Sequence, residues 1–163
     1  MNHSAILEAI QSDGLREALN YWERKRGDRA MPRRQDLDLT DIPVLLTRIT
    51  IADVVDGGDD FVMRYVGRGI SGNQVVLPGV SLLTLPLDPG RDLTLVRYRH
   101  AVTEKRPVYQ RYVFSTATTG DRRIIETVTC PLSDDGETVN KLFTCGHSLG
   151  FAESGQSMGD TLI

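Results

Sequence analysis

Cysteine and long apolar runs are both scarce in this chain of 163 residues. Its two cysteines, Cys130 and Cys145, are too few for a disulfide scaffold and are typical of a reducing compartment. No apolar run approaches the roughly 20 residues that span a bilayer, and the first residues lack the pattern of a signal peptide. The composition therefore predicts a cytoplasmic protein without a membrane span.

An excess of positive charge is also missing, because the formal net charge is −3 and the pI is about 5.6. Basic residues cluster between Arg24 and Arg34, where Asp28 interrupts them and Glu23, Asp36 and Asp38 flank them. That pattern fits a solvated connection better than a nucleic-acid site. We therefore expect no nucleic-acid partner.

What the chain does contain is enough apolar sequence for one domain with a core. Apolar residues spaced by three and four, Leu15, Ala18, Leu19 and Trp22, predict an amphipathic helix. We also expect a short helix over about 40–46 and a longer one over 91–105. Runs of β-branched and aromatic residues predict five strands, over 48–55, 61–66, 108–116, 123–132 and 138–147.

The order of these elements predicts the fold class. Short turns between consecutive strands imply antiparallel pairing, and the helix over 91–105 supplies a crossover. The result is an α+β domain, in which helices cover one face of a five-stranded antiparallel sheet. We expect a helical extension over 1–46, the domain over 47–149 and a flexible tail over 150–163.

One set of motifs indicates a family. The block Leu19 to Gly27, which contains Tyr21-Trp22, and the following Met31-Pro32-Arg33 resemble the opening of small, stand-alone bacterial PAS-domain proteins. Weaker matches continue to about residue 148, through Phe61 to Gly67, Arg106 to Val108 and Cys130 to Gly136. The resemblance implies a PAS-like fold with an N-terminal helical extension.

The resemblance also implies a regulatory or sensory protein. PAS domains bind a small molecule between sheet and helices, or dock protein partners, and pass the change to an output. The expected partners are signalling proteins such as kinases or regulators, with a small-molecule ligand in addition or not. An enzyme is the least supported class, because no nucleophile, base and orienting group can be assembled from these residues.

Two glycine motifs have enzymatic alternatives. Gly67 to Gly72 spells a dinucleotide-binding pattern, but Pro78 interrupts the helix that would hold a pyrophosphate. Gly57 to Phe61 resembles the signature of diguanylate cyclases, with aspartate as its fourth residue. We interpret both motifs as turns.

His100 is the candidate for a haem ligand, because some PAS domains hold haem through a histidine on the long helix. The helical wheel places Leu95 and Tyr98 on one side and His100, with Arg97, on the other, so we expect His100 to face solvent or a partner. No spacing of His, Cys and Asp predicts a metal site. The main expectation is no cofactor, and a haem-type sensor is the alternative.

Strand alternation predicts which side chains face a cavity between the sheet and the long helix. A slip of one residue would invert these faces. The candidates are Phe61, Met63, Tyr65, Leu95, Tyr98, Tyr112, Phe114, Ile124, Glu126 and Val128. A carboxylate such as Glu126 needs a partner there, which is either a ligand or, as we favour, Arg64 or Arg111.

The apolar stripe of the first helix needs a cover. We expect this helix to pack on the outer face of the sheet, which would include Val62 and Val66, within its own chain or in a two-fold homodimer. The interface candidates are Leu15, Leu19, Tyr21 and Trp22, and Trp22 is expected to be buried.

The two cysteines lie on neighbouring predicted strands. A tight turn at Asp135-Gly136 would place Cys130 opposite Lys141 and Cys145 opposite Glu126, which is beyond disulfide reach. A looser loop would bring the two thiols together. We expect free, buried thiols.

Overall fold

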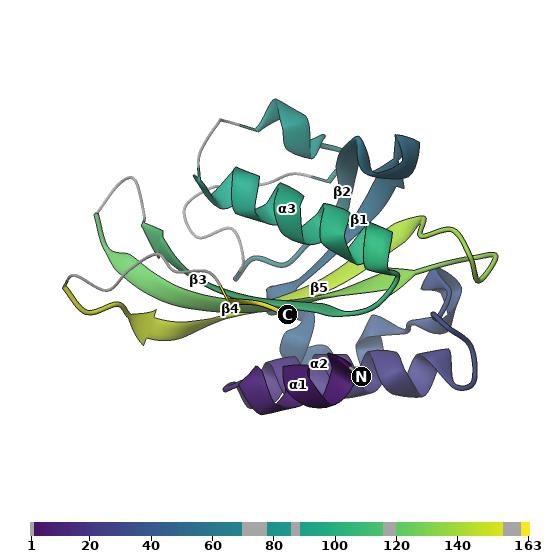
Figure 1. The fold of residues 1–163 in the computed structure, drawn as a ribbon, viewed down its shortest axis with the longest axis horizontal. Helices are drawn as coiled ribbons and strands as arrows, with labels where there is room; N and C mark the ends of the chain where they lie inside the picture. Colours follow the sequence, from purple (N-terminus) through teal and green to yellow (C-terminus); the bar gives the residue numbers. More distant parts are fainter. Residues whose placement is uncertain (1, 70–77, 86–88, 116–119, 155–160) are drawn as a thin grey trace.

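The computed structural model describes residues 2–69, 78–85, 89–115, 120–154 and 161–163. One antiparallel sheet lies between two helical layers, with α3 on one face and α1 and α2 on the other (Figure 1). The helices are α1 (Asn2–Ala9), α2 (Asp13–Arg26) and α3 (Pro89–Glu104). The strands are β1 (Ile49–Val55), β2 (Asp60–Val66), β3 (Val108–Ser115), β4 (Arg122–Leu132), β5 (Lys141–Phe151) and β6 (Thr161–Leu162).

Short 3₁₀ turns connect these elements. They are η1 (Arg34–Asp36), η2 (Leu39–Asp41), η3 (Pro43–Arg48), η4 (Asp56–Gly58) and η5 (Leu82–Thr84). The helix expected over 40–46 is therefore a pair of 3₁₀ turns, η2 and η3.

The sheet has the order β2-β1-β5-β4-β3-β6, and every neighbouring pair is antiparallel. The predicted α+β architecture is confirmed, with one strand more than expected. That strand, β6, pairs with Gln110 and Arg111 at the edge of the sheet. In the tail expected over 150–163, residues 150–151 belong to β5 and residues 161–162 form β6, whereas residues 155–160 lie outside the described part of the chain.

Helix α2 covers the outer face of the sheet within its own chain. The Ser12 side chain caps its first turn by accepting a hydrogen bond from the backbone N–H of Leu15 at 3.3 Å. At the other end of the buried stripe, the Trp22 indole N–H donates to the carbonyl of Pro131 at 2.8 Å, and only 2% of Trp22 is exposed. The expected packing and the burial of Trp22 are confirmed.

The same packing corrects the interface prediction. All four interface candidates are fully or almost fully buried against their own sheet: Leu15, Leu19, Tyr21 and Trp22. Their side chains are therefore part of the core of this chain and do not form a surface that a second copy could contact.

Helix α1 is part of the helical extension expected over 1–46, although the predicted apolar stripe begins only at Leu15. Ile6 and Ile10, four residues apart, are almost completely buried and give the segment its apolar side. His3 Nδ1 lies 3.1 Å from Glu23 Oε1, which links α1 to α2. The first residues are thus a structural part of the outer layer.

Both glycine motifs have structural roles in the described residues. A Cβ on Gly67 would lie 2.5 Å from the carbonyl carbon of Thr47, so only glycine permits this approach of two backbones. Gly57 and Gly58 have φ angles of 70° and 112° in the η4 turn, which favour glycine. The rest of the first motif, 70–72, lies outside the described residues.

Candidate functional site

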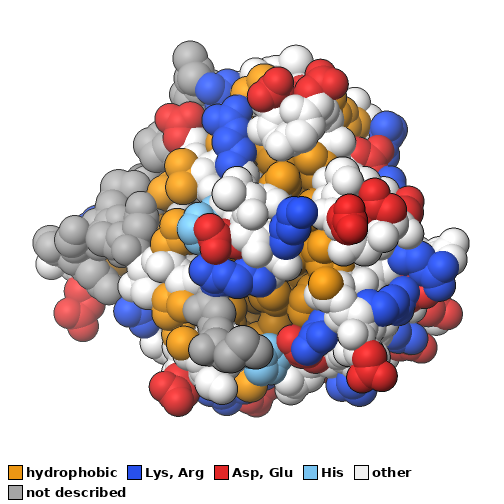
Figure 2. Space-filling model, turned by 45° about the vertical axis from the view of Figure 1, so that its right-hand side comes forward, with side chains coloured by type: hydrophobic (Ala, Val, Ile, Leu, Met, Phe, Trp, Pro, Cys, Tyr) orange, Lys and Arg blue, Asp and Glu red, His pale blue; other side chains and the backbone are white. Residues whose placement is uncertain are grey.

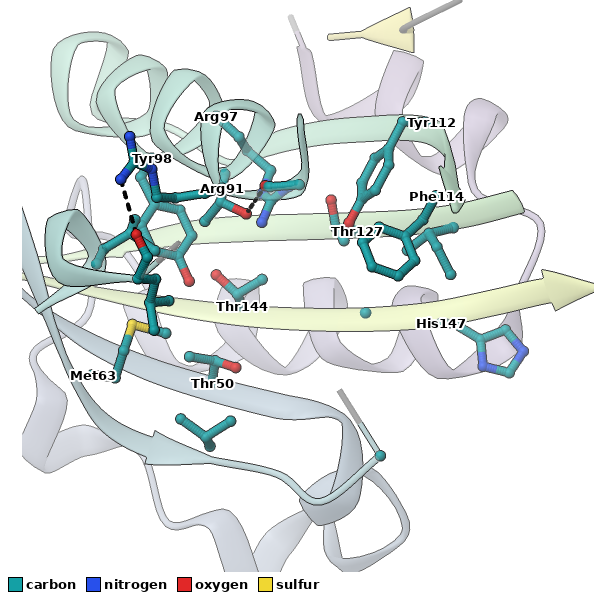
Figure 3. A pocket seen from close by; sticks show the side chains of 18 of the residues that line it. Thr50, Met63, Arg91, Arg97, Tyr98, Tyr112, Phe114, Thr127, Thr144 and His147 are labelled. Atoms are coloured by element: carbon teal, nitrogen blue, oxygen red, sulfur yellow. Dashed lines mark hydrogen bonds between the residues drawn. The ribbon is translucent and has the colours of Figure 1, made fainter. Parts of the chain in front are cut away.

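A cavity of about 260 Å³ lies between the inner face of the sheet and the layer of α3 and η5 (Figure 3). Part of its lining is apolar: Met63, Val66, Leu82, Leu85, Phe114 and Ile125. The rest consists of polar residues, glycines and His147: Thr50, Gly69, Gly90, Arg91, Thr94, Arg97, Tyr98, Tyr112, Thr127, Thr144, Gly146, His147 and Ser148. An apolar site with convergent polar groups is the usual form of a small-molecule site.

The structure places some of the predicted cavity residues at this site and others elsewhere. Those in the lining are Met63, Tyr98, Tyr112 and Phe114. Phe61 is buried beside the cavity, with its ring centre 5.1 Å from that of Tyr98, and Leu95 belongs to the same core. These two residues support the lining without being part of it.

The predicted face of β4 is wrong. Ile125 and Thr127 line the cavity, so the alternation of the strand turns Ile124, Glu126 and Val128 toward the outer layer. The strand is buried without interruption from Glu126 to Leu132. Because both faces of β4 are covered, the polarity of its residues does not distinguish the face toward the cavity from the face toward the outer layer. The predicted inward residues are therefore offset by one position.

A bulge corrects the end of β2. Ile51 pairs with Tyr65 while the next residue, Ala52, pairs with Met63, so Arg64 is the extra residue. The bulge turns Tyr65 to the outer face, where its hydroxyl donates to the carbonyl of Leu46 at 2.7 Å. It also turns Val66, which we expected on the outer face, into the cavity.

Glu126 holds the outer layer to the sheet instead of capping a ligand. Its fully buried carboxylate accepts hydrogen bonds from the backbone N–H groups of Gln11 (3.1 Å) and Ser12 (2.7 Å) and from the Tyr109 hydroxyl (3.1 Å). Burial, followed by the charge of Glu126, raises the pKa of Tyr109. Neither expected arginine pairs with Glu126 in the described structure, and Arg64 pairs with Asp53 at 2.6 Å.

Arg97 is the cavity residue that the sequence prediction missed. It reaches from α3 toward the sheet and is only 4% exposed (Figure 3). Its Nε donates to the Thr129 hydroxyl at 3.0 Å and its Nη1 to Gln110 Oε1 at 2.7 Å. The helical wheel, centred on Leu95, placed Arg97 toward solvent, but the buried side of α3 also includes Ala101 and so extends to Arg97.

Hydroxyl groups continue the polar network across the sheet. The hydroxyls of Thr129 and Thr144 lie 3.0 Å apart, and both residues are buried. Burial raises the pKa of Tyr98, and the charge of Arg97, followed by hydrogen bonding to Thr144, opposes that shift. Arg97, the two threonines and Tyr98 therefore form one polar cluster at the inner face of the sheet.

His100 is half-buried on α3 and is not among the residues that line the cavity. The haem-ligand candidate is thus not at the site. Over the described ranges, no three His, Cys, Asp or Glu residues are grouped as metal ligands. Among the same residues, no helix has the length and apolarity to cross a membrane.

The two cysteines lie closer than the tight-turn register would place them. Cys130 pairs with Phe143 and Cys145 with Val128, because the β4–β5 connection is longer than a two-residue turn. The tight-turn register was therefore wrong. Both thiols are free and fully buried, as expected, and burial raises the pKa of Cys145 to about 12.

The basic segment between Arg24 and Arg34 is paired with acidic side chains. Arg29 Nη1 lies 2.7 Å from Asp36, and Lys25 Nζ lies 3.1 Å from Asp41. On the face in Figure 2, acidic and basic side chains are interspersed and not separated by sign. This arrangement fits a solvated connection.

His147 should make stability dependent on pH. Its ring points away from the cavity (Figure 3), and burial, followed by the charge of Arg48, lowers its pKa below 6.5. A lowered pKa means that the unfolded chain binds the proton first, so His147 contributes stability above pH 6.5 that is lost as the pH falls. Urea unfolding at pH 7.5 and 5.5 should show a smaller loss for His147→Gln than for the unsubstituted protein. Equal losses would contradict this role.

The fold and the cavity define a class: an α+β sensor-type domain with a small site under its crossover helix. A family model described as "PAS domain" matches residues 10–144. The chain therefore belongs to the PAS-domain family, and the resemblance found in its motifs is confirmed.

Three solved structures are similar to this chain at low sequence identity. A sensory box histidine kinase/response regulator from Burkholderia thailandensis E264 has 11% identity and a TM-score of 0.42, over 69% of this chain and 86% of that one. A fungal LOV-domain photoreceptor has 13% identity and a TM-score of 0.43, over 71% and 94%. The ligand-binding domain of the Pseudomonas aeruginosa PAO1 amino-acid chemoreceptor PctC, in complex with GABA, has 16% identity and a TM-score of 0.44, over 83% and 53%. No curated protein matches the sequence.

Proposed function

We propose that this chain is a regulatory PAS module that binds a small molecule in its cavity and relays occupancy through contact with a signalling protein. The observation that carries the proposal is the cavity itself, which combines an apolar part with buried, mutually hydrogen-bonded polar groups. Binding, and not catalysis, is the proposed role of these groups. The proposed partners are kinases or other regulators.

The construction of β4 supports a route for the signal. Thr127 faces the cavity, and the adjacent Glu126 holds the backbone at the start of α2. A ligand that shifts this strand would therefore shift the outer helical layer as well. The outer layer is the proposed contact surface, and a homodimer would use its exposed side because its apolar stripe is already buried.

Two further points belong to the proposal. The two free, buried thiols fit the reducing environment of the cytoplasm. Haem has less support than a small organic ligand, because the one histidine among the described lining residues, His147, directs its ring away from the cavity (Figure 3).

Gly146 allows a direct test of the cavity. A Cβ at this position would lie 3.5 Å from the Thr127 methyl group, an ordinary contact, so a methyl group fits there and a larger side chain would extend into the cavity. Gly146→Leu should fill the cavity and weaken the binding of fragments at least tenfold, with Gly146→Ala as the matched control that leaves most of the space open. Ligand-observed NMR with a fragment library measures binding, and thermal unfolding shows that both variants fold. A folded Gly146→Leu protein that binds the same fragments equally well would refute the cavity as the site.

A further inference from the structure

The cavity holds a buried positive charge without a negative partner. Arg97 is only 4% exposed, and both of its hydrogen-bond acceptors, Thr129 and Gln110, are neutral. No carboxylate of the described residues lies within ion-pair distance of its guanidinium. These two hydrogen bonds use two of its five N–H donors, and its side chain also interacts with the hydroxyl group of the adjacent Tyr98, which is neutral as well.

Such an arrangement is costly for a protein that keeps its cavity empty. A guanidinium remains charged in a protein, so Arg97 cannot relieve the cost of burial by losing a proton. A buried charge without an opposite charge beside it destabilises the folded protein. The guanidinium carbon of Arg97 lies 5.4 Å from the centre of the Tyr98 ring. This cation–π contact offsets only part of the cost of burying the charge.

The surroundings of Arg97 define the ligand that would compensate the charge. No aspartate or glutamate occurs among the described residues that line the cavity, so an anion would meet no like charge there. Hydroxyl groups of Tyr98 and Thr144 lie in the same polar cluster. Met63, Leu82 and Phe114 supply an apolar wall for the rest of the molecule.

We propose that the ligand of this cavity is a small organic monocarboxylate with an apolar body, whose carboxylate binds Arg97. This inference rests on the proposed function and names its ligand class. One negative charge balances the one unpaired guanidinium, and planar carboxylates match the guanidinium fork. A dianion such as a phosphate monoester would leave an excess negative charge in a cavity whose other cation, Arg91, already donates to the carbonyl of Leu85 at 3.0 Å.

Matched acids and amides test the ligand class on the intact protein. Hexanoate and 3-phenylpropanoate would be titrated against hexanamide and 3-phenylpropanamide by calorimetry, with inorganic phosphate as a further probe. Each amide has nearly the shape of its acid but lacks the charge. We expect at least one acid to bind at least tenfold more tightly than its amide, and phosphate to bind more weakly than the acid.

Variants of α3 test the anchor. Arg97→Gln keeps a hydrogen-bond donor but removes the charge, so it should abolish the preference for the acid, and Arg97→Lys should retain part of it. Arg99→Gln is the control, because Arg99 lies on the same helix and donates to the carbonyls of Gly58 (3.0 Å) and Asp59 (3.1 Å) outside the cavity. The preference for the acid should be unchanged in this control.

The outcomes separate this inference from the proposed function. Equal binding of acids and amides, or tighter binding of phosphate, overturns the monocarboxylate and leaves the cavity as a ligand site. A preference for the acid that survives in Arg97→Gln overturns Arg97 as the anchor. A third outcome is that no acid binds, whereas neutral fragments bind and Gly146→Leu excludes them; in that case only the ligand class is wrong. If no fragment binds either, the proposed function fails as well. If Arg97→Gln does not fold, the comparison of acids and amides on the unsubstituted protein still decides the ligand class.

Discussion

Deleting residues 1–30 is expected to yield a protein that aggregates or fails to fold. The deletion removes α1 and α2, whose residues Ile6, Leu15 and Trp22 are buried in the hydrophobic core. It would expose the apolar outer face of β4 and β5, and large exposed apolar faces cause association. Size-exclusion chromatography with light scattering and thermal unfolding would show a larger mass and a lost or lowered transition.

The matched control is deletion of residues 161–163. This deletion removes β6, which pairs with Gln110 and Arg111, and Ile163, which makes two backbone hydrogen bonds with Tyr109. It leaves the outer face covered. We expect the shorter deletion to remain monodisperse with a small decrease in melting temperature. A soluble protein of unchanged melting temperature after deletion of residues 1–30 would mean that the N-terminal layer is a free tether for another protein.

Glu126→Ala should cost about 3–5 kcal/mol of unfolding free energy. The substitution leaves three buried donors without their acceptor, the backbone N–H groups of Gln11 and Ser12 and the Tyr109 hydroxyl. Each unsatisfied buried group costs about 1–3 kcal/mol, and the entry of water reduces the sum. Urea unfolding followed by tryptophan fluorescence measures the loss, since Trp22 lies in the layer that Glu126 holds.

Glu126→Gln is the conservative comparison. Its amide keeps one acceptor oxygen and the size of the side chain, so the expected loss is about 1–3 kcal/mol. If both variants lose less than about 1 kcal/mol, the carboxylate does not fix the start of α2, and the proposed route from cavity to outer layer loses its support.

The fold was predictable from sequence because its elements have clear periods. The stripe through Leu15 and Trp22 repeats at helical spacing, and turn residues such as Asp56 and Gly57 separate β1 from β2. Local periodicity does not show how far a loop extends before pairing resumes. For that reason the register of β4 against β5 was wrong, although the strands themselves were predicted.

The site was less predictable, for physical reasons that differ between residues. β4 is covered on both sides, so its apolar residues carry no information on which face meets the cavity. The bulge at Arg64 reverses Tyr65 and Val66, and no residue type in that segment requires it. Arg97 has the residue type of a surface position, and only the tertiary structure shows that its long side chain turns inward.

The positions of the two cysteines give the outer layer its own reporter. Cys130 and Cys145 lie on the face of the sheet that α2 covers, where burial raises both pKa values and Glu23 and Glu17 of that helix add to the shift. Neither thiol is accessible while the helix is in place. A thiol reagent can therefore modify them only in molecules whose outer layer has opened, and the rate of modification measures the free energy of that opening separately from global unfolding. The two native cysteines thus report the opening of the layer through which the chain would transmit its signal, and no added label is needed.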